Sequence, residues 1–241
     1  FGLVQNFVIL ACLYAVIMTA SALYLEPPEQ VQLETKGEFK VQLPQQAQYS
    51  VQEAMQTWQF YALWWIFFTN ITCGIGLLAV ASPMAQEVIG MSPVAAASMV
   101  GIIGLLNGGG RIVWSTVSDY LGRANTYIAF FIIEIIAFYL LGGVQGSFMF
   151  QLLVFIIITC YGGGFSCMPA YLSDLFGTKQ LSAIHGRILT AWGLAGIAGP
   201  LLLSVIYERT HSYSITLYFF SICFILSLLM AIVLKFKGKT A

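Results

Sequence analysis

The stretch Asn107–Asn125, NGGGRIVWSTVSDYLGRAN, decides how the rest of the chain is interpreted. It carries Arg111, the only basic residue well inside an apolar span, and it leaves that span through an Asp-x-x-Gly-Arg turn from Asp119 to Arg123. Apolar spans lie on both sides of it. The stretch therefore predicts a membrane helix that faces a solute, followed by a conformational latch at the membrane surface.

The composition places the chain in a lipid bilayer. Its 241 residues are 59% hydrophobic and only 8% charged, whereas a soluble domain carries about 25% charged residues. The formal net charge is zero, so nothing indicates a nucleic-acid partner. The five cysteines lie in apolar runs without paired spacing, which indicates packed free thiols. We therefore expect no disulfide framework, no metal site and no cofactor.

Seven apolar stretches are long enough, or nearly long enough, to cross a membrane as helices. A bilayer core of about 30 Å needs about 20 apolar residues, and the spans are Leu3–Leu25, Trp58–Ser82, Pro93–Thr116, Tyr127–Leu141, Met149–Tyr171, Ile184–Ile206 and Ile215–Leu234. The fourth is short unless its ends extend into the flanking loops. Barrel strands would instead alternate over about ten residues. The sequence thus predicts an all-α polytopic membrane protein.

The spacing of the spans predicts one helix, a long linker and a compact helical unit. We expect a first helix at residues 1–25, a polar linker at 26–57, a six-helix transmembrane bundle at 58–235 and a basic tail at 236–241. Within the linker, Ser50 and Glu53 fit a capping box. This pattern predicts a helix that starts there and runs into the second span.

The distribution of Lys and Arg predicts the orientation. If the loops alternate between the two sides, one side holds only Arg209, and the other holds Lys36, Lys40, Arg123, Lys179, Arg187, Lys235, Lys237 and Lys239. Cytoplasmic loops carry the excess of such residues, so we expect a cytoplasmic C-terminus. The odd number of spans, together with an apolar start at Phe1, leads us to expect that an upstream part is missing.

Glycines mark three of the spans. Triplets occur at 108–110 and 162–164, and Gly193, Gly196 and Gly199 lie in the sixth span. Small residues allow helix backbones to approach closely, and Gly can also permit bending. Tight packing and movement during a transport cycle both remain open.

Arg111 is the strongest candidate for a binding residue. A charge inside the membrane costs several kcal/mol, so it should face protein or water. Asn107 lies four residues earlier on the same helix face. A planar guanidinium suits a carboxylate bidentately. The two residues predict an anion site, and the alternative is an Arg that snorkels or pairs with a structural carboxylate.

The residue types of the Asp119–Arg123 turn predict a structural turn at the membrane surface and not a catalytic site. Asp119 can pair with an Arg or accept hydrogen bonds from a helix N-terminus. Gly122 can supply a positive φ, and Arg123 completes the pattern.

Other candidates lie at mid-span depth. Glu134 interrupts the fourth span and could carry a proton, although a neutral Glu bonded to a neighbouring helix is the alternative. Tyr161 and Phe165 share a helix face, and with Trp192 they could form either packing or a solute wall. Neither histidine lies at mid-span depth to serve Ser166 as a base, and phosphate loops and paired carboxylates are lacking. An enzyme is therefore not indicated.

Several stretches of the sequence resemble a known family. Ser115–Ala124, STVSDYLGRA, resembles the loop motif of the major facilitator superfamily, with Ser115 in place of the usual first Gly. Longer stretches resemble the oxalate:formate antiporter family, and they are Gly74–Glu87, Asn107–Arg123, Tyr161–Gly177 and His185–Pro200. Together they cover nearly the whole chain.

The resemblance implies that the spans are helices six to twelve of twelve, with a solute bound between two halves that alternate in access. It implies that Arg111 binds a carboxylate, that Tyr161, Phe165 and Trp192 lie on pathway helices, and that Asp119 acts in a latch against the missing N-terminal half. Trp192 departs from the family as we place the motif, because oxalate carriers have Lys there. This departure favours a monocarboxylate, or a second cation supplied by the missing half.

These observations predict a transporter of small carboxylate anions in a bilayer, namely the cytoplasmic membrane of a bacterium, and antiport as its mode. One alternative is a proton-coupled monocarboxylate symporter with Glu134 in the proton path. Another is a solute sensor or scaffold with the same fold that moves nothing.

Overall fold

A computed structural model describes residues 2–24 and 48–237, and this part of the chain is helical throughout apart from its connections. It divides into two compact units, residues 1–44 and residues 45–241. The first unit contains one apolar helix, α1 (Leu3–Tyr24). Seven of the described helical segments are long and apolar enough to cross a membrane. The prediction of an all-α polytopic membrane protein is confirmed.

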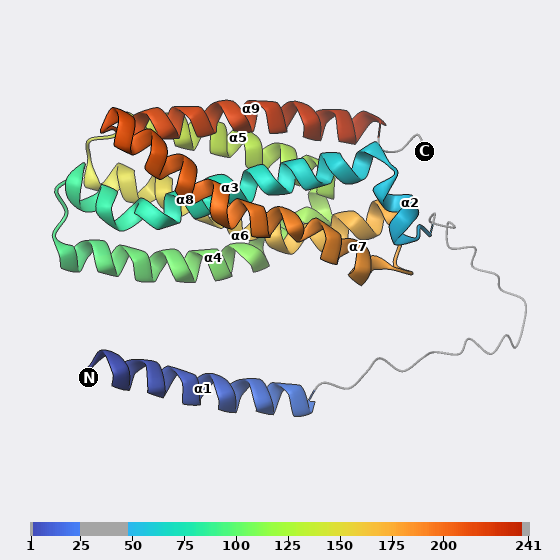
Figure 1. Cartoon of the computed structure of the whole chain (residues 1–241), viewed down its shortest axis with the longest axis horizontal. Coiled ribbons are helices and arrows are strands. Elements are labelled where there is room, and N and C mark those ends of the chain that lie inside the picture. Colours follow the sequence, from blue (N-terminus) through green and yellow to red (C-terminus); the bar gives the residue numbers. More distant parts are fainter. Residues whose placement is uncertain (1, 25–47, 238–241) are drawn as a thin grey trace, which may run out of the picture. The chain divides into compact units, whose positions relative to one another are not determined.

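The second unit contains the helices that form the bundle (Figure 1). They are α2 (Val51–Met55), α3 (Trp58–Glu87), α4 (Pro93–Leu121), α5 (Arg123–Leu141), α6 (Ser147–Phe176), α7 (Leu181–Ile188), α8 (Thr190–Thr210) and α9 (Tyr213–Lys237). The first expected span corresponds to α1, and its last residue, Leu25, lies outside the described residues. The other six expected spans lie on the bundle helices, most of which extend further at one or both ends. The short fourth span gains length because α5 begins at Arg123. The sixth span is interrupted at Leu189, between α7 and α8.

The start of the bundle corrects one prediction. The capping box is present, because the Ser50 side chain accepts from the Glu53 backbone N–H and Glu53 accepts from that of Ser50. These Ser50 hydrogen bonds hold the pKa of Glu53 below its usual range. The helix does not run into the second span, however. It ends at Met55, and Thr57 adopts an extended backbone and caps a new helix through the Phe60 N–H.

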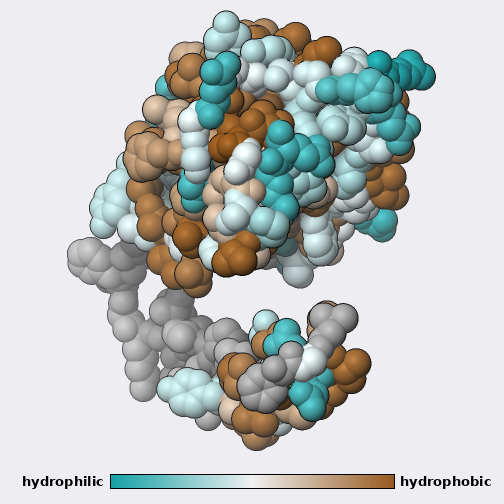
Figure 2. Space-filling view, turned by 90° about the vertical axis from the view of Figure 1, so that its left-hand side faces the viewer, coloured by the Kyte–Doolittle hydropathy of each residue, from teal (hydrophilic) through white to brown (hydrophobic). Residues whose placement is uncertain are grey.

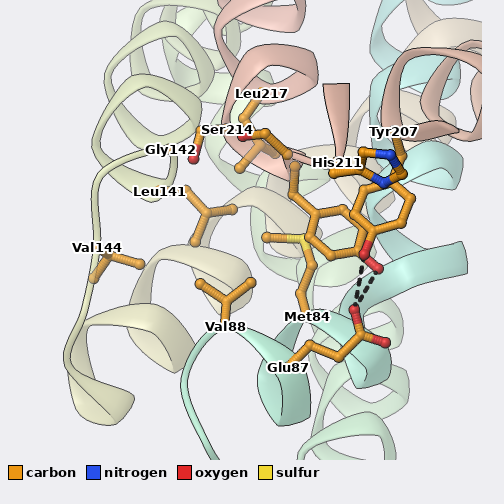
Figure 3. A pocket seen from close by; sticks show the side chains of 12 residues that line it. Met84, Glu87, Val88, Leu141, Gly142, Val144, Tyr207, His211, Ser214 and Leu217 are labelled. Atoms are coloured by element: carbon orange, nitrogen blue, oxygen red, sulfur yellow. Dashed lines mark hydrogen bonds between the residues drawn. The ribbon is translucent and has the colours of Figure 1, made fainter. Parts of the chain in front are cut away.

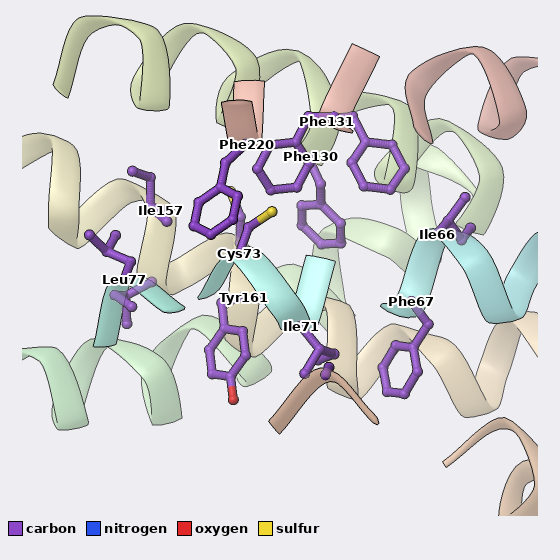
Figure 4. Close-up of a cluster of buried hydrophobic side chains, with 14 of the residues drawn as sticks. Ile66, Phe67, Ile71, Cys73, Leu77, Phe130, Phe131, Ile157, Tyr161 and Phe220 are labelled. Carbon is purple, nitrogen blue, oxygen red and sulfur yellow. The ribbon is translucent and has the colours of Figure 1, made fainter. Parts of the chain in front are cut away.

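Helix α6 lies inside the bundle and contacts α3, α4 and α5, while α8 packs on α3 and α9 packs on α5 (Figure 1). A core of apolar and aromatic side chains fills the space between α3, α5, α6 and α9, including Phe67, Phe130 and Phe220 (Figure 4). We call the end of the bundle where α4 ends and α5 begins the Arg123 end. The opposite end, where α3 ends, is the Glu87 end.

The surface at the Glu87 end differs from the flanks of the bundle. Hydrophilic and weakly hydrophobic residues cover much of this end, and strongly hydrophobic ones lie along its sides (Figure 2). Many large apolar side chains are exposed on the bundle helices, among them Leu105, Ile112, Ile197 and Leu229. In a membrane protein such side chains can face lipid or another helix, so their exposure is consistent with a bilayer location.

The three consecutive glycines of α6 allow three close contacts. A Cβ at each position would collide with a different neighbour, which is Asn107 for Gly162, Trp114 and Phe130 for Gly163, and Asn70 for Gly164. Consecutive helical residues point about 100° apart, so the triplet serves contacts in several directions at one level. Close packing is therefore one observed role of this triplet, and bending or sliding remains a prediction.

Only one of the three consecutive glycines of α4 lies in a close helix contact. A Cβ on Gly110 would lie 2.7 Å from the backbone oxygen of Thr159 in α6, whereas Cβ atoms on Gly108 and Gly109 would meet nothing within 4 Å. Of the three glycines in this triplet, only Gly110 therefore limits how closely α4 can approach α6.

We predict that Gly110→Ala destabilises the fold and that its neighbour Gly109→Ala does not. The added methyl at position 110 must displace helix backbone, which typically costs about 1–3 kcal/mol. At position 109 the gain in helix propensity is up to about 1 kcal/mol in the stabilising direction. Thermal unfolding in detergent micelles checks both variants. Equal midpoints for the two variants would contradict the packing role of Gly110.

Candidate functional site

Arg111 lies over an aromatic cluster built from two other helices. The guanidinium carbon of Arg111, on α4, is 5.3 Å from the centre of the Phe165 ring on α6. Phe165 meets Tyr161 edge to face at 5.6 Å between ring centres, and it meets Trp192 of α8 in the same way at 5.9 Å. Four of the five residues predicted to bind solute thus lie together, and we call them the Arg111 cluster.

The backbone of α6 is fixed to α4 and α3 at this level. Ser166 donates a hydrogen bond of 3.0 Å to the Arg111 carbonyl oxygen. The Phe165 ring also packs edge to face on Phe67 of α3, with ring centres 5.3 Å apart. Phe67 is fully buried, so the inner side of Phe165 rests on the core.

The outer side of the cluster is open. Arg111 is exposed, and the Trp192 side chain is 49% exposed. Tyr161 is buried among core residues, but its hydroxyl points away from the neighbouring rings of the core (Figure 4). The cluster therefore combines a cation, aromatic faces and one phenol at an open face of the bundle.

The guanidinium of Arg111 has no ion pair and no hydrogen bond to any residue that the structure describes. Its stacking on Phe165 is a cation–π contact, which leaves the five N–H donors available. An Arg with free donors beside aromatic faces is suited to bind an anion.

Asn107 is placed differently from the expectation. Its side-chain oxygen is buried against Gly162 and lacks a hydrogen-bond partner within the described residues. In that part of the chain no hydrogen bond joins it to the Arg111 guanidinium. Asn107 therefore belongs to the α4–α6 packing in this conformation, and its contact with a solute remains a prediction.

The Asp119–Arg123 turn forms a small ionic network at the Arg123 end. Gly122 has a φ of +85°, as its place in the motif predicts, and separates α4 from α5 by a single residue. Arg123 donates to Asp119 at 2.5 Å and to the Ser118 hydroxyl at 2.8 Å. Its Nε lies 3.8 Å from the Asp174 carboxylate at the end of α6.

Asp174 was not among the predicted latch residues. Its contact with Arg123 spans 51 positions of sequence, and the only available signal was its place three residues before the glycine that ends α6. The network thus joins the ends of α4, α5 and α6 within the bundle. A contact of Asp119 with another half of the protein remains a prediction.

Glu134 is fully buried between helices. The Asn70 amide on α3 donates to both of its carboxyl oxygens, at 3.0 and 3.3 Å. This is the neighbouring-helix hydrogen bond that the sequence offered as the alternative to a proton site. Proton transfer by Glu134 remains a prediction.

A second polar cluster lies at the Glu87 end and was missed from the sequence. The Glu87 carboxylate accepts hydrogen bonds from Tyr207 at 3.3 Å and from Tyr213 at 3.1 Å, beside a cavity of about 270 Å³ (Figure 3). The two tyrosine rings stack with centres 4.3 Å apart. Glu87 thereby connects the end of α3 to α8 and α9.

The fold and the cluster define a membrane-embedded helical bundle with a cation at an open face. Residues 109–240 match the Major Facilitator Superfamily, which is more than half of the chain. The chain therefore belongs to this superfamily, as the sequence motifs predicted.

The chain is also similar in sequence to three curated transport proteins. The chain is 31% identical to the oxalate:formate antiporter of Oxalobacter formigenes over 61% of its length, and the match covers 35% of that protein. It is 23% identical to the uncharacterised MFS-type transporter YhjX of Escherichia coli (strain K12), over 81% of this chain and 48% of the relative. It is 25% identical to apicoplast pyruvate carrier 1 of Toxoplasma gondii, over 66% and 29%. The chain thus spans less than half the length of each.

We predict that Asp119→Asn changes the balance between inward-open and outward-open states more than the affinity for solute. Asp119 contributes a mostly exposed charge to the Arg123 network, and such pairs contribute about 0.2–1 kcal/mol, which corresponds to a shift of up to about fivefold. Cysteine accessibility on the two sides of the membrane measures the balance. Asp174→Asn, at the longer 3.8 Å contact, is the matched control and should have a smaller effect. An unchanged balance in Asp119→Asn would count against the latch.

Proposed function

We propose that this chain forms part of a secondary transporter that moves small organic carboxylate anions by alternating access, with Arg111 as the anchor for the anion. The observation that carries the proposal is the free guanidinium of Arg111 over Phe165, at an open face of the bundle. A carboxylate can accept two parallel N–H bonds from such a group. No other basic residue lies well inside an apolar span.

The composition of the cluster supports one carboxylate and a small organic group as the solute. Arg111 supplies one cation, and Tyr161, Phe165 and Trp192 supply apolar faces with one phenol. A dianion would bring a second charge into this aromatic environment without a second cation from the described residues. A monocarboxylate therefore fits this half of the site better than a dicarboxylate does.

The names of two relatives also support a small carboxylate as the solute. One is named an oxalate:formate antiporter and another a pyruvate carrier, and both names contain small carboxylates. The first name also supports exchange of anions as the mode of transport. Because the chain spans under half of each relative, we expect further residues of the pathway to come from outside this chain.

The distribution of positive residues supports an orientation in the membrane. At the Arg123 end the described residues include Arg123, Lys179, Arg187 and Lys235, whereas Arg209 lies at the Glu87 end. The excess of positive residues supports a cytoplasmic location of the Arg123 end. The C-terminus would then be cytoplasmic, in a bacterial cytoplasmic membrane.

A proton-coupled monocarboxylate symporter is the second candidate. The name of the pyruvate carrier supports its monocarboxylate solute, and the buried Glu134 is its candidate proton site. Uptake by a symporter responds to an imposed proton gradient, whereas strict exchange requires an anion on the opposite side. A sensor or scaffold would bind solute without moving it. Proteoliposomes loaded with or without an internal anion, with and without a pH gradient, separate these cases.

We predict that Arg111→Gln lowers counterflow of the transported anion about tenfold or more, since hydrogen bonds to charged groups contribute about 1.5–3 kcal/mol. The measurement uses the full-length protein in proteoliposomes with labelled formate, oxalate, pyruvate and lactate. We expect a monocarboxylate to be exchanged faster than oxalate.

Arg209→Gln is the matched control, because Arg209 is an exposed Arg in the last turn of α8 at the other end of the bundle. It should leave counterflow unchanged. Exchange that survives Arg111→Gln would return Arg111 to a structural role. The absence of counterflow for every labelled anion in the wild-type protein would contradict the proposed function.

A further inference from the structure

The buried pair of Glu134 on α5 and Asn70 on α3 contacts α6 at Gly164, one residue before Phe165 of the Arg111 cluster. Both side chains are completely buried, and the amide of Asn70 donates to the carboxyl group of Glu134. The oxygen of the same amide has no hydrogen-bond partner among the described residues. It is directed at Gly164, where an added Cβ would collide with it.

Gly164 also makes a contact with α5, the helix that carries Glu134. The hydroxyl of Tyr127, on α5, donates a hydrogen bond of 2.7 Å to the carbonyl oxygen of Gly164. Tyr127 and Glu134 are seven residues apart, so they lie on the same face of α5 two turns apart. The α6 backbone at Gly164 thus has two fixed contacts. Tyr127 donates a hydrogen bond to its carbonyl oxygen, and the Asn70 amide packs against its α-carbon.

The next residue of α6 is Phe165, the ring on which Arg111 stacks. Phe165 is in contact with Arg111, Tyr161 and Trp192 at once. A change in the position or rotation of α6 at Gly164 would therefore move the ring that supports the guanidinium. The separation of α3 from α6 at this level depends on the rotamer of Asn70, and its bond to Glu134 holds that rotamer.

We propose that Glu134 and Asn70 are positioning residues for the Arg111 cluster, which act through Gly164 and Phe165 and do not touch the transported solute. The inference rests on the proposed function in one respect, because the solute of the cluster is the proposed carboxylate. Glu134 serves as a hydrogen-bond acceptor in this role, and a proton transfer is not part of it.

The test compares variants that keep or remove the acceptor. Glu134→Gln keeps an oxygen that can accept from Asn70, whereas Glu134→Leu removes it and leaves the amide unpaired. Ser221→Ala is the matched control, because Ser221 is a buried residue of α9 that donates to the carbonyl of Ile135, the neighbour of Glu134. This control removes a polar contact to α5 on the side away from Gly164.

In counterflow with labelled formate and pyruvate, Glu134→Leu should raise KM about tenfold with a smaller change in maximal rate, since an unpaired buried polar group and a displaced ring weaken binding. Glu134→Gln should stay within about threefold of wild type, and Ser221→Ala should not change KM. Asn70→Leu combined with Glu134→Leu should be no worse than Asn70→Leu alone, because the two act as one unit.

A second measurement does not depend on transport. Phenylglyoxal modifies exposed Arg side chains, and peptide mass spectrometry gives the rate at Arg111 with the exposed Arg187 as an internal reference. Glu134→Leu should speed the labelling of Arg111, because Phe165 no longer covers the guanidinium in the same way, and Ser221→Ala should not.

The outcomes separate the two proposals. If the wild-type protein moves none of the anions, the proposed function fails, and the labelling rates still test the positioning pair. Unchanged KM and unchanged Arg111 labelling in Glu134→Leu would overturn the positioning role. It would also be overturned if Glu134→Gln retained exchange but lost the response to a proton gradient, because Glu134 would then be a proton carrier.

Discussion

The bundle depends on the close approach of α6 to its neighbours at Gly162, Gly163 and Gly164. In a bilayer the lipid tails are as apolar as leucine, so helices associate mainly through van der Waals packing and interhelical hydrogen bonds. Both kinds of contact converge on this triplet. Its small size admits Asn107, Trp114 and Asn70 from two other helices, and its carbonyl at Gly164 accepts from Tyr127. Tyr161 and Phe165 of the Arg111 cluster flank the triplet, so the proposed solute contacts and the core packing share one segment of α6.

Several features of the fold and site could be predicted because their signals are local. Run length and low charge indicated the membrane helices, and the Asp-x-x-Gly-Arg spacing indicated a turn with a positive φ at Gly122. The i, i+4 spacing placed Tyr161 and Phe165 on one face, and they are in contact. The isolated position of Arg111 in an apolar run marked it as a residue that needs a special environment.

Other features depend on residues that are far apart in the sequence. Asn70 and Glu134 are 64 positions apart, and Glu87 and Tyr213 are 126 apart, so no local pattern links either pair. For Asn107, the sequence predicted the position on the helix but not the direction of the side chain. Helical spacing correctly placed it near Arg111 on α4, but the packing of α6 decides that its side chain turns toward Gly162. The break before Trp58 was missed because the cap of Thr57 competes with a continuous helix, and the sequence gives no measure of which is more stable.

The free guanidinium of Arg111 also bears on the part of a transport cycle in which no solute is bound. In the proposed carrier, a bound carboxylate offsets the charge of Arg111, whereas the empty site keeps a net positive charge. Moving a net charge through a medium of low dielectric constant costs more than moving a neutral pair. The loaded form would therefore reorient more readily than the empty form. Such a kinetic asymmetry makes a carrier return with another anion instead of returning empty, and it would follow from one arginine that stacks on a ring and has no acidic partner within the described residues.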